Sequence, residues 1–181
     1  GDVIGGIVCG RKAFIDEVRM FGLKDMTGAV MGPFEAYLVL RGLKTMDVRM
    51  ERHNANAMRV AEWLEACGKV EKVYYPGLAS FDGHELAAKQ MSGFGGMLSF
   101  EVKGGRAAGA KLLDSFEMIS TAVSLGDAET LAEHPASMTH SPYSAEELKE
   151  AGISEGLVRM SVGLENVEDI IADLAQAFEQ I

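Results

Sequence analysis

The sequence predicts a mixed α/β or α+β domain in which helices cover a sheet. Apolar residues recur at helical spacing along residues 43–66, where charged residues occupy the other positions. A second such stripe follows Asn166, which precedes acidic residues and is expected to cap a helix at the C-terminal end. Between these helices, residues 97–102 and 157–162 are short apolar runs typical of buried strands.

The first forty residues predict a strand, a helix, a loop and a second helix. Residues 3–9, with the sequence VIGGIVC, are expected to form a buried strand. Residues 11–21 predict a helix, and residues 23–32 predict a loop. Pro33 is expected in the first turn of a helix that runs to about Leu40, because proline fits the start of a helix.

The rest of the chain alternates between short strands and short helices. Ser144 is followed three residues later by Glu147, which predicts a capping box at a helix start. The expected elements are strand 70–75, helix 84–91, strand 97–102, helix 107–116, strand 117–123, a loop over 124–143, helix 144–152 and strand 157–162.

The composition is that of an ordinary globular protein, with 48% hydrophobic and 24% charged residues. The formal net charge of −10 argues against nucleic acid as the main partner. The apolar runs are too short to span a bilayer. Cys9 and Cys67 lie far apart without a CxxC pair, which indicates free thiols in a reducing compartment such as the cytoplasm. The histidines show no metal-ligand spacing, so we expect no metal site.

Arg159 lies in the middle of the apolar run at residues 157–162. Alternation along a strand places it on the face opposite Val158 and Met160. A guanidinium in such a place needs an anionic partner, because its desolvation costs several kcal/mol. Two interpretations are open: an internal ion pair with Asp or Glu, or bidentate binding of a substrate carboxylate.

The loop at residues 122–140 is long and rich in small and hydroxyl residues, and loops of this kind commonly carry function. It contains SLGDAETLAEHPASMTH, which resembles the pyridoxal-phosphate enzymes of cysteine and methionine metabolism. That family includes cystathionine synthases and lyases, homoserine sulfhydrylases and methionine gamma-lyases. Three further segments resemble the same family: LRGLKTMDVRMERHNANAMRVAEWLE, VYYPGLAS and GISEGLVRMSVGLENVEDIIADLAQAF.

The resemblance implies the fold-type I architecture of pyridoxal-phosphate-dependent transferases. Residues 1–70, with the long helix, would be the end of the large cofactor-binding domain. Residues 71–181 would be a small domain with helices on a mainly antiparallel sheet. In this family a lysine holds pyridoxal 5′-phosphate as a Schiff base, shortly before the segment that GDVIGG resembles. We therefore expect that lysine upstream of Gly1, and neither Lys12 nor Lys24 in that role.

The same resemblance implies four substrate-binding residues. Arg159 matches the arginine that grips the α-carboxylate of the amino acid, and Ser124 matches a position whose backbone and hydroxyl help to hold it. Ser124 is equally suited to a turn before Gly126, and that interpretation is open. Thr139 matches a hydroxyl close to the arginine, and Val123 matches a position against the substrate side chain.

Within the family, GDVIGGIVCG at residues 1–10 and GLKDMTGAV at residues 22–30 are most similar to the methionine gamma-lyases. Lys24 and Asp25 match positions associated there with the substrate pocket, although an exposed charge pair by itself contributes little. The implied reaction is the α,γ-elimination of L-methionine to methanethiol, 2-oxobutanoate and ammonia. Such enzymes are homotetramers whose active sites are shared between subunits.

Two alternatives are open. The first is another activity of the same family, that of a cystathionine gamma-lyase or an O-acylhomoserine sulfhydrylase, which the same loop and arginine would serve. The second belongs to another class, because this segment without its Schiff-base lysine would be a catalytically inactive oligomerisation module. Product analysis and mapping of the cofactor-bearing lysine distinguish them.

Overall fold

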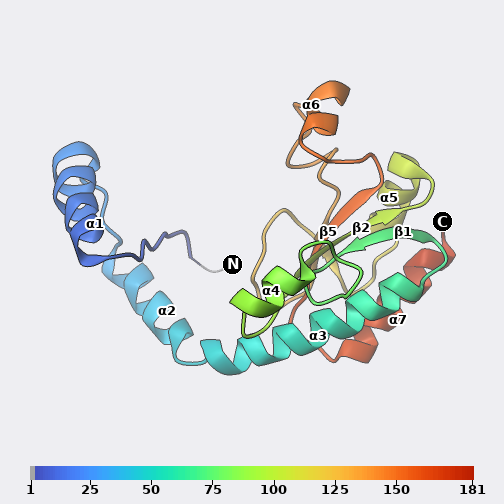
Figure 1. The fold of residues 1–181 in the computed structure, drawn as a ribbon, viewed down its shortest axis with the longest axis horizontal. Helices are drawn as coiled ribbons and strands as arrows, with labels where there is room; N and C mark the ends of the chain where they lie inside the picture. Colours follow the sequence, from blue (N-terminus) through green and yellow to red (C-terminus); the bar gives the residue numbers. More distant parts are fainter. Residues whose placement is uncertain (1–2) are drawn as a thin grey trace. The chain divides into compact units, whose positions relative to one another are not determined.

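The computed structural model describes residues 3–181 and divides into two compact units. The first ends at Asp47, and the second runs from Val48 to Ile181 (Figure 1). The domain boundary expected near residue 70 stays a prediction. No helix in the described part of the chain is both long enough and apolar enough to cross a membrane.

The first unit is helical, with α1 (Lys12–Glu17), the π-helix η1 (Val18–Thr27) and α2 (Pro33–Leu43). The prediction that residues 23–32 form a loop is wrong up to Thr27, because η1 continues through Gly22. A single glycine inside a helix costs only about 1 kcal/mol relative to alanine, which the helix tolerates. The helix ends instead at Gly28, whose φ of 63° lies in the left-handed region that glycine adopts without strain.

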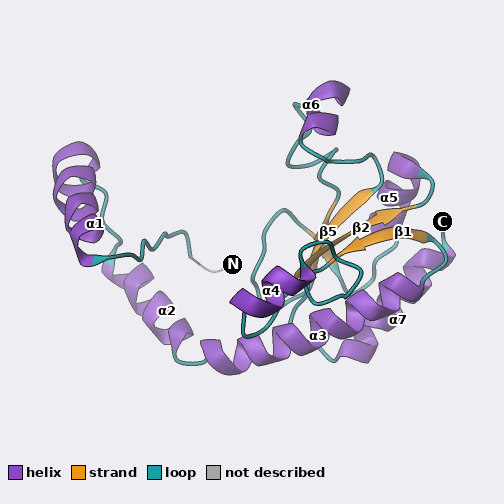
Figure 2. Ribbon diagram, viewed as in Figure 1, coloured by secondary structure: helices purple, strands orange, loops and turns teal. Residues whose placement is uncertain are grey.

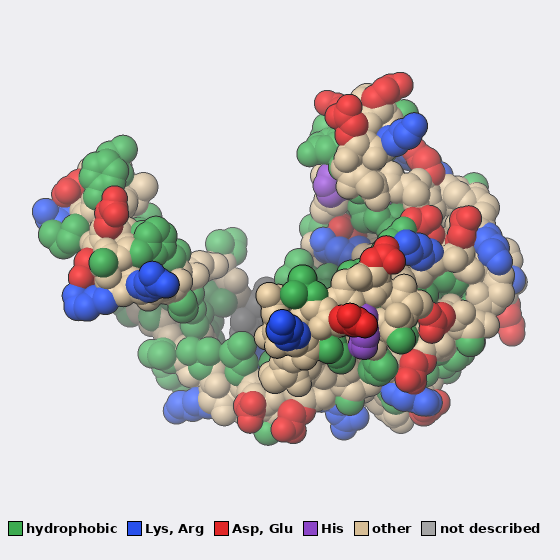
Figure 3. All heavy atoms as spheres, viewed as in Figure 1, with side chains coloured by type: hydrophobic (Ala, Val, Ile, Leu, Met, Phe, Trp, Pro, Cys, Tyr) green, Lys and Arg blue, Asp and Glu red, His purple; other side chains and the backbone are tan. Residues whose placement is uncertain are grey.

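The strand predicted for residues 3–9 is wrong, because residues 3–11 have no regular secondary structure. A strand needs a hydrogen-bonded neighbour, and no strand of the described first unit offers one. Ile4 is 98% exposed within this structure. Apolar side chains are prominent on the surface of this unit (Figure 3). The largest of them include Ile4, Ile7, Phe14, Phe21, Met26, Val30, Phe34 and Leu40.

The second unit is built on a five-stranded sheet with the order β1-β2-β5-β4-β3 (Figure 2). All neighbouring pairs are antiparallel except β3 and β4, which are parallel. This arrangement confirms the predicted helices on a mainly antiparallel sheet. The strands are β1 (Val70–Tyr74), β2 (Met97–Val102), β3 (Ser120–Thr121), β4 (Leu131–Glu133) and β5 (Leu157–Ser161).

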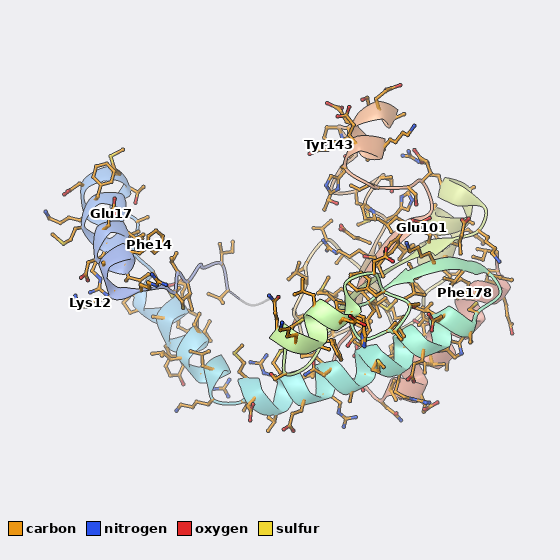
Figure 4. All side chains as sticks on the ribbon, viewed as in Figure 1. Lys12, Phe14, Glu17, Glu101, Tyr143 and Phe178 are labelled. Atoms are coloured by element: carbon orange, nitrogen blue, oxygen red, sulfur yellow. The ribbon has the colours of Figure 1, made fainter. Side chains whose placement is uncertain are left out.

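The core of the second unit lies between the sheet and the helices packed on it. Phe178 shows how the layers meet, since its ring lies 5.9 Å from that of Trp63 and 6.1 Å from that of Phe100 (Figure 4). The predicted stripes face the core over residues 57–64 and in α7, where Leu64 and Leu174 are fully buried. The predicted stripe is wrong at its start, because Met46 and Met50 are exposed in this structure. The helices are α3 (Met46–Ala66), α4 (His84–Gln90), α5 (Gly105–Asp114), α6 (Ala145–Glu150) and α7 (Val167–Glu179).

The helix caps form as the sequence predicts. The Ser144 hydroxyl accepts the Glu147 backbone N–H, and the Glu147 carboxylate accepts the Ser144 backbone N–H, so the capping box of α6 is complete. The Ser144 backbone N–H, and after it the Ser144 hydroxyl, stabilise the charged carboxylate and lower the pKa of Glu147 below its usual value. Asn166 caps α7 by accepting the N–H of Glu168. These motifs are predictable because all their partners lie within one helical turn.

Two predictions in the middle of the chain are wrong. The strand expected over 117–123 shrinks to β3, because the Asp173 carboxylate accepts the backbone N–H groups of residues 117–119 at 2.8–3.0 Å. Those groups are thus unavailable for a strand ladder. The expected loop over 124–143 contains β4, whose three residues are all buried. Its pairing with β5 is a long-range contact that local pattern does not reveal.

Candidate substrate-carboxylate site

Strand β5 places Arg159 on the sheet face opposite the helices. Its neighbours Val158 and Met160 are fully buried in the core, which confirms the predicted alternation. Because β5 lies between β2 and β4, Arg159 stands directly beside Ser99 on one side and Glu133 on the other. The guanidinium is therefore held over the middle of a rigid sheet, between residues far away in the sequence.

The guanidinium of Arg159 contacts three acceptors. Its Nη1 lies 2.8 Å from Oε1 of Glu133 in an ion pair. Its Nη2 donates to the backbone carbonyls of Val123 at 2.8 Å and Ser124 at 3.1 Å. Because the guanidinium carries five N–H groups and has these three acceptors among the described residues, Nε–H and one N–H of Nη1 have no protein acceptor there. Its side chain is 23% exposed, so water or a small anion can reach it.

The structure therefore contains the internal ion pair that was one of the two interpretations of Arg159. Binding of a substrate carboxylate, the second interpretation, needs an accessible guanidinium with unused N–H groups, and Arg159 is partly exposed and has them. An Arg–carboxylate pair that already exists can still bind a second carboxylate through the remaining N–H groups of the planar fork.

Glu133 is a residue of this cluster that the sequence did not single out. Its side chain is 1% exposed, and its Oε1 receives both the guanidinium and, at 3.3 Å, the hydroxyl of Thr139. Its Oε2 is buried and has no hydrogen-bond partner in the structure. The available signal was weak: an acid directly after Leu131 and Ala132, in a segment that was assigned to a loop.

The loop that carries Val123 and Ser124 is tied down beyond them by the sheet. The Ser161 hydroxyl, buried two residues after Arg159 on the same strand face, accepts the N–H of Gly126 at 2.9 Å. Gly126 has a φ of 73°, which bends the loop at that point. The side chain of Val123 remains 54% exposed.

A second set of hydrogen bonds fixes the other end of the loop, at Thr130. The carboxylate of Glu165 accepts both the backbone N–H and the hydroxyl of Thr130, and the same hydroxyl accepts the N–H of Gly163. Asn56 of α3 donates to the carbonyls of Gly163 and Glu165. Four of the six predicted site residues, Val123, Ser124, Thr139 and Arg159, thus belong to one cluster.

Lys24 and Asp25 lie in the other compact unit, within η1. They form an ion pair with each other at 3.3 Å, and their side chains are 66% and 54% exposed. Screening by water makes such an exposed ion pair weak, so its contribution to folding stability does not explain why these two residues are present. Their assignment to a substrate pocket stays a prediction.

The described residues do not supply a lysine suited to hold an aldehyde cofactor. A lysine that forms a Schiff base readily at neutral pH needs its amine pKa lowered by burial or by a neighbouring cation. The buried charged and polar side chains of the described residues include no lysine. Lys12, with its side chain 88% exposed, pairs with Asp16.

Comparison with known proteins establishes the class. A family described as Cys/Met metabolism PLP-dependent enzyme matches residues 1–179. The chain belongs to this family of pyridoxal-phosphate-dependent enzymes, as its motifs indicated. A solved structure of MetB from Corynebacterium glutamicum superposes with a TM-score of 0.84 at 43% identity, over 93% of this chain and 43% of that one.

Individual relatives resemble the chain to different degrees. An L-methionine gamma-lyase from Fusobacterium nucleatum subsp. polymorphum is 61% identical over 181 residues. That match takes in 100% of this chain but only 46% of the relative, so the chain spans less than half of that protein. An O-succinylhomoserine sulfhydrylase from Pseudomonas aeruginosa is 44% identical over 176 residues, which cover 97% of this chain and 43% of the relative.

Proposed function

We propose that this chain is the carboxylate-recognising part of a carbon–sulfur lyase that uses pyridoxal 5′-phosphate. The whole enzyme would convert L-methionine and water into methanethiol, 2-oxobutanoate and ammonia. The observation that carries the proposal is Arg159, a partly exposed guanidinium that retains unused N–H groups on a rigid strand. The 61% identity to an L-methionine gamma-lyase supports methionine as the substrate.

In this proposal Arg159 binds the α-carboxylate of the amino acid through its free N–H groups. Its Nη2 stays bound to the carbonyls of Val123 and Ser124, so the guanidinium cannot swing away from the loop. The backbone and hydroxyl of Ser124 add contacts to the same carboxylate. Holding one end of the substrate in this way orients its Cα–H bond, and such positioning can contribute several kcal/mol to catalysis.

Other predicted residues complete the pocket. The exposed side chain of Val123 would contact the methionine side chain, and Thr139 would support the arginine through Glu133. Lys24 and Asp25 would line the pocket in the complete enzyme, which we propose to be a cytoplasmic homotetramer. Pyridoxal phosphate, when bound, would withdraw electrons from the substrate carbon, and the lysine that carries it would lie outside residues 1–181.

A second activity of the same family, O-acylhomoserine sulfhydrylation or cystathionine cleavage, has weaker support. The P. aeruginosa sulfhydrylase shares 44% identity with this chain, against 61% for the methionine gamma-lyase. The carboxylate site would serve either reaction, since all these substrates are amino acids. Assay of the complete enzyme with methionine, cystathionine and O-acetylhomoserine, with product analysis, decides between them.

The direct test uses Arg159→Lys and Arg159→Ala in the complete enzyme. Lysine keeps the charge but loses the planar fork, so we expect KM for methionine to rise sharply and kcat/KM to fall. For alanine we expect a loss of about 3 kcal/mol, which is more than a hundredfold in kcat/KM. Near-normal kinetics in both variants would refute the assignment.

Cofactor mapping is an independent check. Borohydride reduction of the complete enzyme with its cofactor, followed by peptide mapping, should label a lysine outside residues 1–181. A label inside them would contradict the proposal.

A further inference from the structure

Glu133 makes an unusual set of contacts for a buried acid. Only its Oε1 has partners, namely Nη1 of Arg159 at 2.8 Å and the hydroxyl of Thr139 at 3.3 Å. Its Oε2 is buried without any donor, although a buried carboxylate oxygen normally accepts hydrogen bonds. A neutral side chain of the same size would avoid this desolvation cost. The ion pair with Arg159 offsets this cost, so the contact with the arginine is what the acid contributes at this position.

Glu133 also differs from the other two acceptors of Arg159 in where it comes from. The carbonyls of Val123 and Ser124 belong to a loop. Glu133 lies on β4, directly opposite Arg159 in the antiparallel register, and its side chain is 1% exposed. A contact from a rigid, buried element defines a side-chain orientation more sharply than a contact from a loop.

We propose that Glu133 is a positioning residue for the recognition of the substrate carboxylate, acting through Arg159. Its Oε1 holds Nη1 in place, so that the guanidinium meets the incoming carboxylate with its free N–H groups already oriented. Because a long arginine side chain loses much rotamer freedom when it is fixed, orienting it before the substrate arrives strengthens binding. This inference rests on the proposed function, since it assumes that Arg159 binds the carboxylate.

The reach of the side chain, rather than its charge, is the property that matters in this proposal. Glu133→Asp keeps the charge but shortens the side chain by one methylene, so its carboxylate can no longer reach the position that Oε1 of Glu133 takes 2.8 Å from Arg159 without a shift of the sheet. Glu133→Gln keeps the length and one acceptor oxygen but removes the charge. Glu133→Ala removes the contact without leaving a buried charge.

The experiment uses the complete enzyme loaded with its cofactor and two competitive inhibitors. One, 4-(methylthio)butanoate, has the carboxylate of methionine but no amine. The other, 3-(methylthio)propylamine, has the amine but no carboxylate. We expect Glu133→Asp to raise the inhibition constant of the acid and the KM for methionine by about tenfold. The inhibition constant of the amine should stay within about twofold, because that compound does not reach Arg159.

The matched variants make the result decisive. Glu133→Gln should recover most of the binding of the acid, and Glu133→Ala should behave as Glu133→Asp does, which keeps the test valid if the aspartate variant fails to fold. Equal shifts for acid and amine would mean general damage to the site and overturn the proposal. No shift in the aspartate and alanine variants, or a glutamine variant as defective as they are, would also overturn it.

Arg159→Lys in the same series separates this inference from the proposed function. If the acid binds equally well to that variant, Arg159 does not recognise the carboxylate and the proposed function loses its basis. If Arg159→Lys weakens the acid while Glu133→Asp does not, the proposed function stands and only the positioning role of Glu133 is refuted.

Discussion

Replacing Arg159 with alanine removes the cation that neutralises a carboxylate of which only 1% is exposed. Among the residues that the structure describes, Glu133 would then keep only the Thr139 hydroxyl as a partner, and Oε2 would still have none. Removing one partner of a buried ion pair usually costs about 3–5 kcal/mol, because the other charge stays buried and uncompensated. The Arg159 side chain is 23% exposed, so water can partly take its place. We therefore expect the free energy of unfolding to fall by about 3 kcal/mol, at the lower end of that range.

The double variant Arg159→Ala with Glu133→Gln should be more stable than Arg159→Ala alone. It removes the buried charge together with its partner, so only ordinary hydrogen bonds are lost, at about 1 kcal/mol. The second substitution would therefore restore about 2 kcal/mol of the free energy of unfolding.

Hydrogen exchange of the complete protein, resolved to the peptides of β4 and β5, measures this locally. A loss of 3 kcal/mol raises the opening equilibrium by somewhat more than a hundredfold, and the double variant should recover most of that factor. Peptides of α2 in the other unit serve as an internal control. Equal exchange rates in the single and double variants would refute the view that an uncompensated Glu133 is the cause.

Two further predictions concern the elements that support the site. Asp173→Asn should lower the free energy of unfolding by about 2 kcal/mol, because the carboxylate accepts three backbone N–H groups of residues 117–119. Burial acts to raise the pKa of Asp173, but these hydrogen bonds outweigh it, so the folded pKa lies below the unfolded value. The stabilisation is therefore complete above the unfolded pKa of about 3.9, and it is lost as the pH falls through the lower folded pKa. Urea unfolding between pH 7 and pH 3 checks both statements, and a variant with an unchanged pH profile would contradict them. Gly163→Ala should weaken binding of 4-(methylthio)butanoate. The added Cβ would lie 2.6 Å from the carbonyl carbon of Glu129 and closer still to the carbonyl oxygen of Ala128. This clash would displace the backbone at residues 128–129, which ends the loop that carries Val123 and Ser124. Inhibition constants equal to those of the unchanged enzyme would show that the loop absorbs the methyl group.

Local pattern predicted much of the second unit. Strand 97–102 agrees with β2, and the caps at Ser144 and Asn166 formed as expected, because their partners lie within a few residues. The predicted strand at residues 3–9 failed because apolar sequence does not supply a neighbouring strand to pair with. The strand predicted over 117–123 failed at residues 117–119, because Asp173 of α7 accepts their backbone N–H groups.

The candidate site divides in the same way. An arginine inside an apolar alternation shows in the sequence alone that an anion must meet it. That its Nη2 donates to the carbonyls of Val123 and Ser124 is known only from the structure. The motifs also place the chain in its family. Which anion meets Arg159 in the folded chain could not be read in this way.

The sequence by itself therefore determined the periodic helices, the strands β2 and β5, the family and the presence of a guanidinium that needs a negative partner. Only the tertiary structure decided that Glu133 is this partner and that Oε2 remains unpaired. The physical reason is that local periodicity records which face of an element is apolar, whereas an ion pair across two strands depends on their register. That register is set by the packing of the whole sheet against its helices.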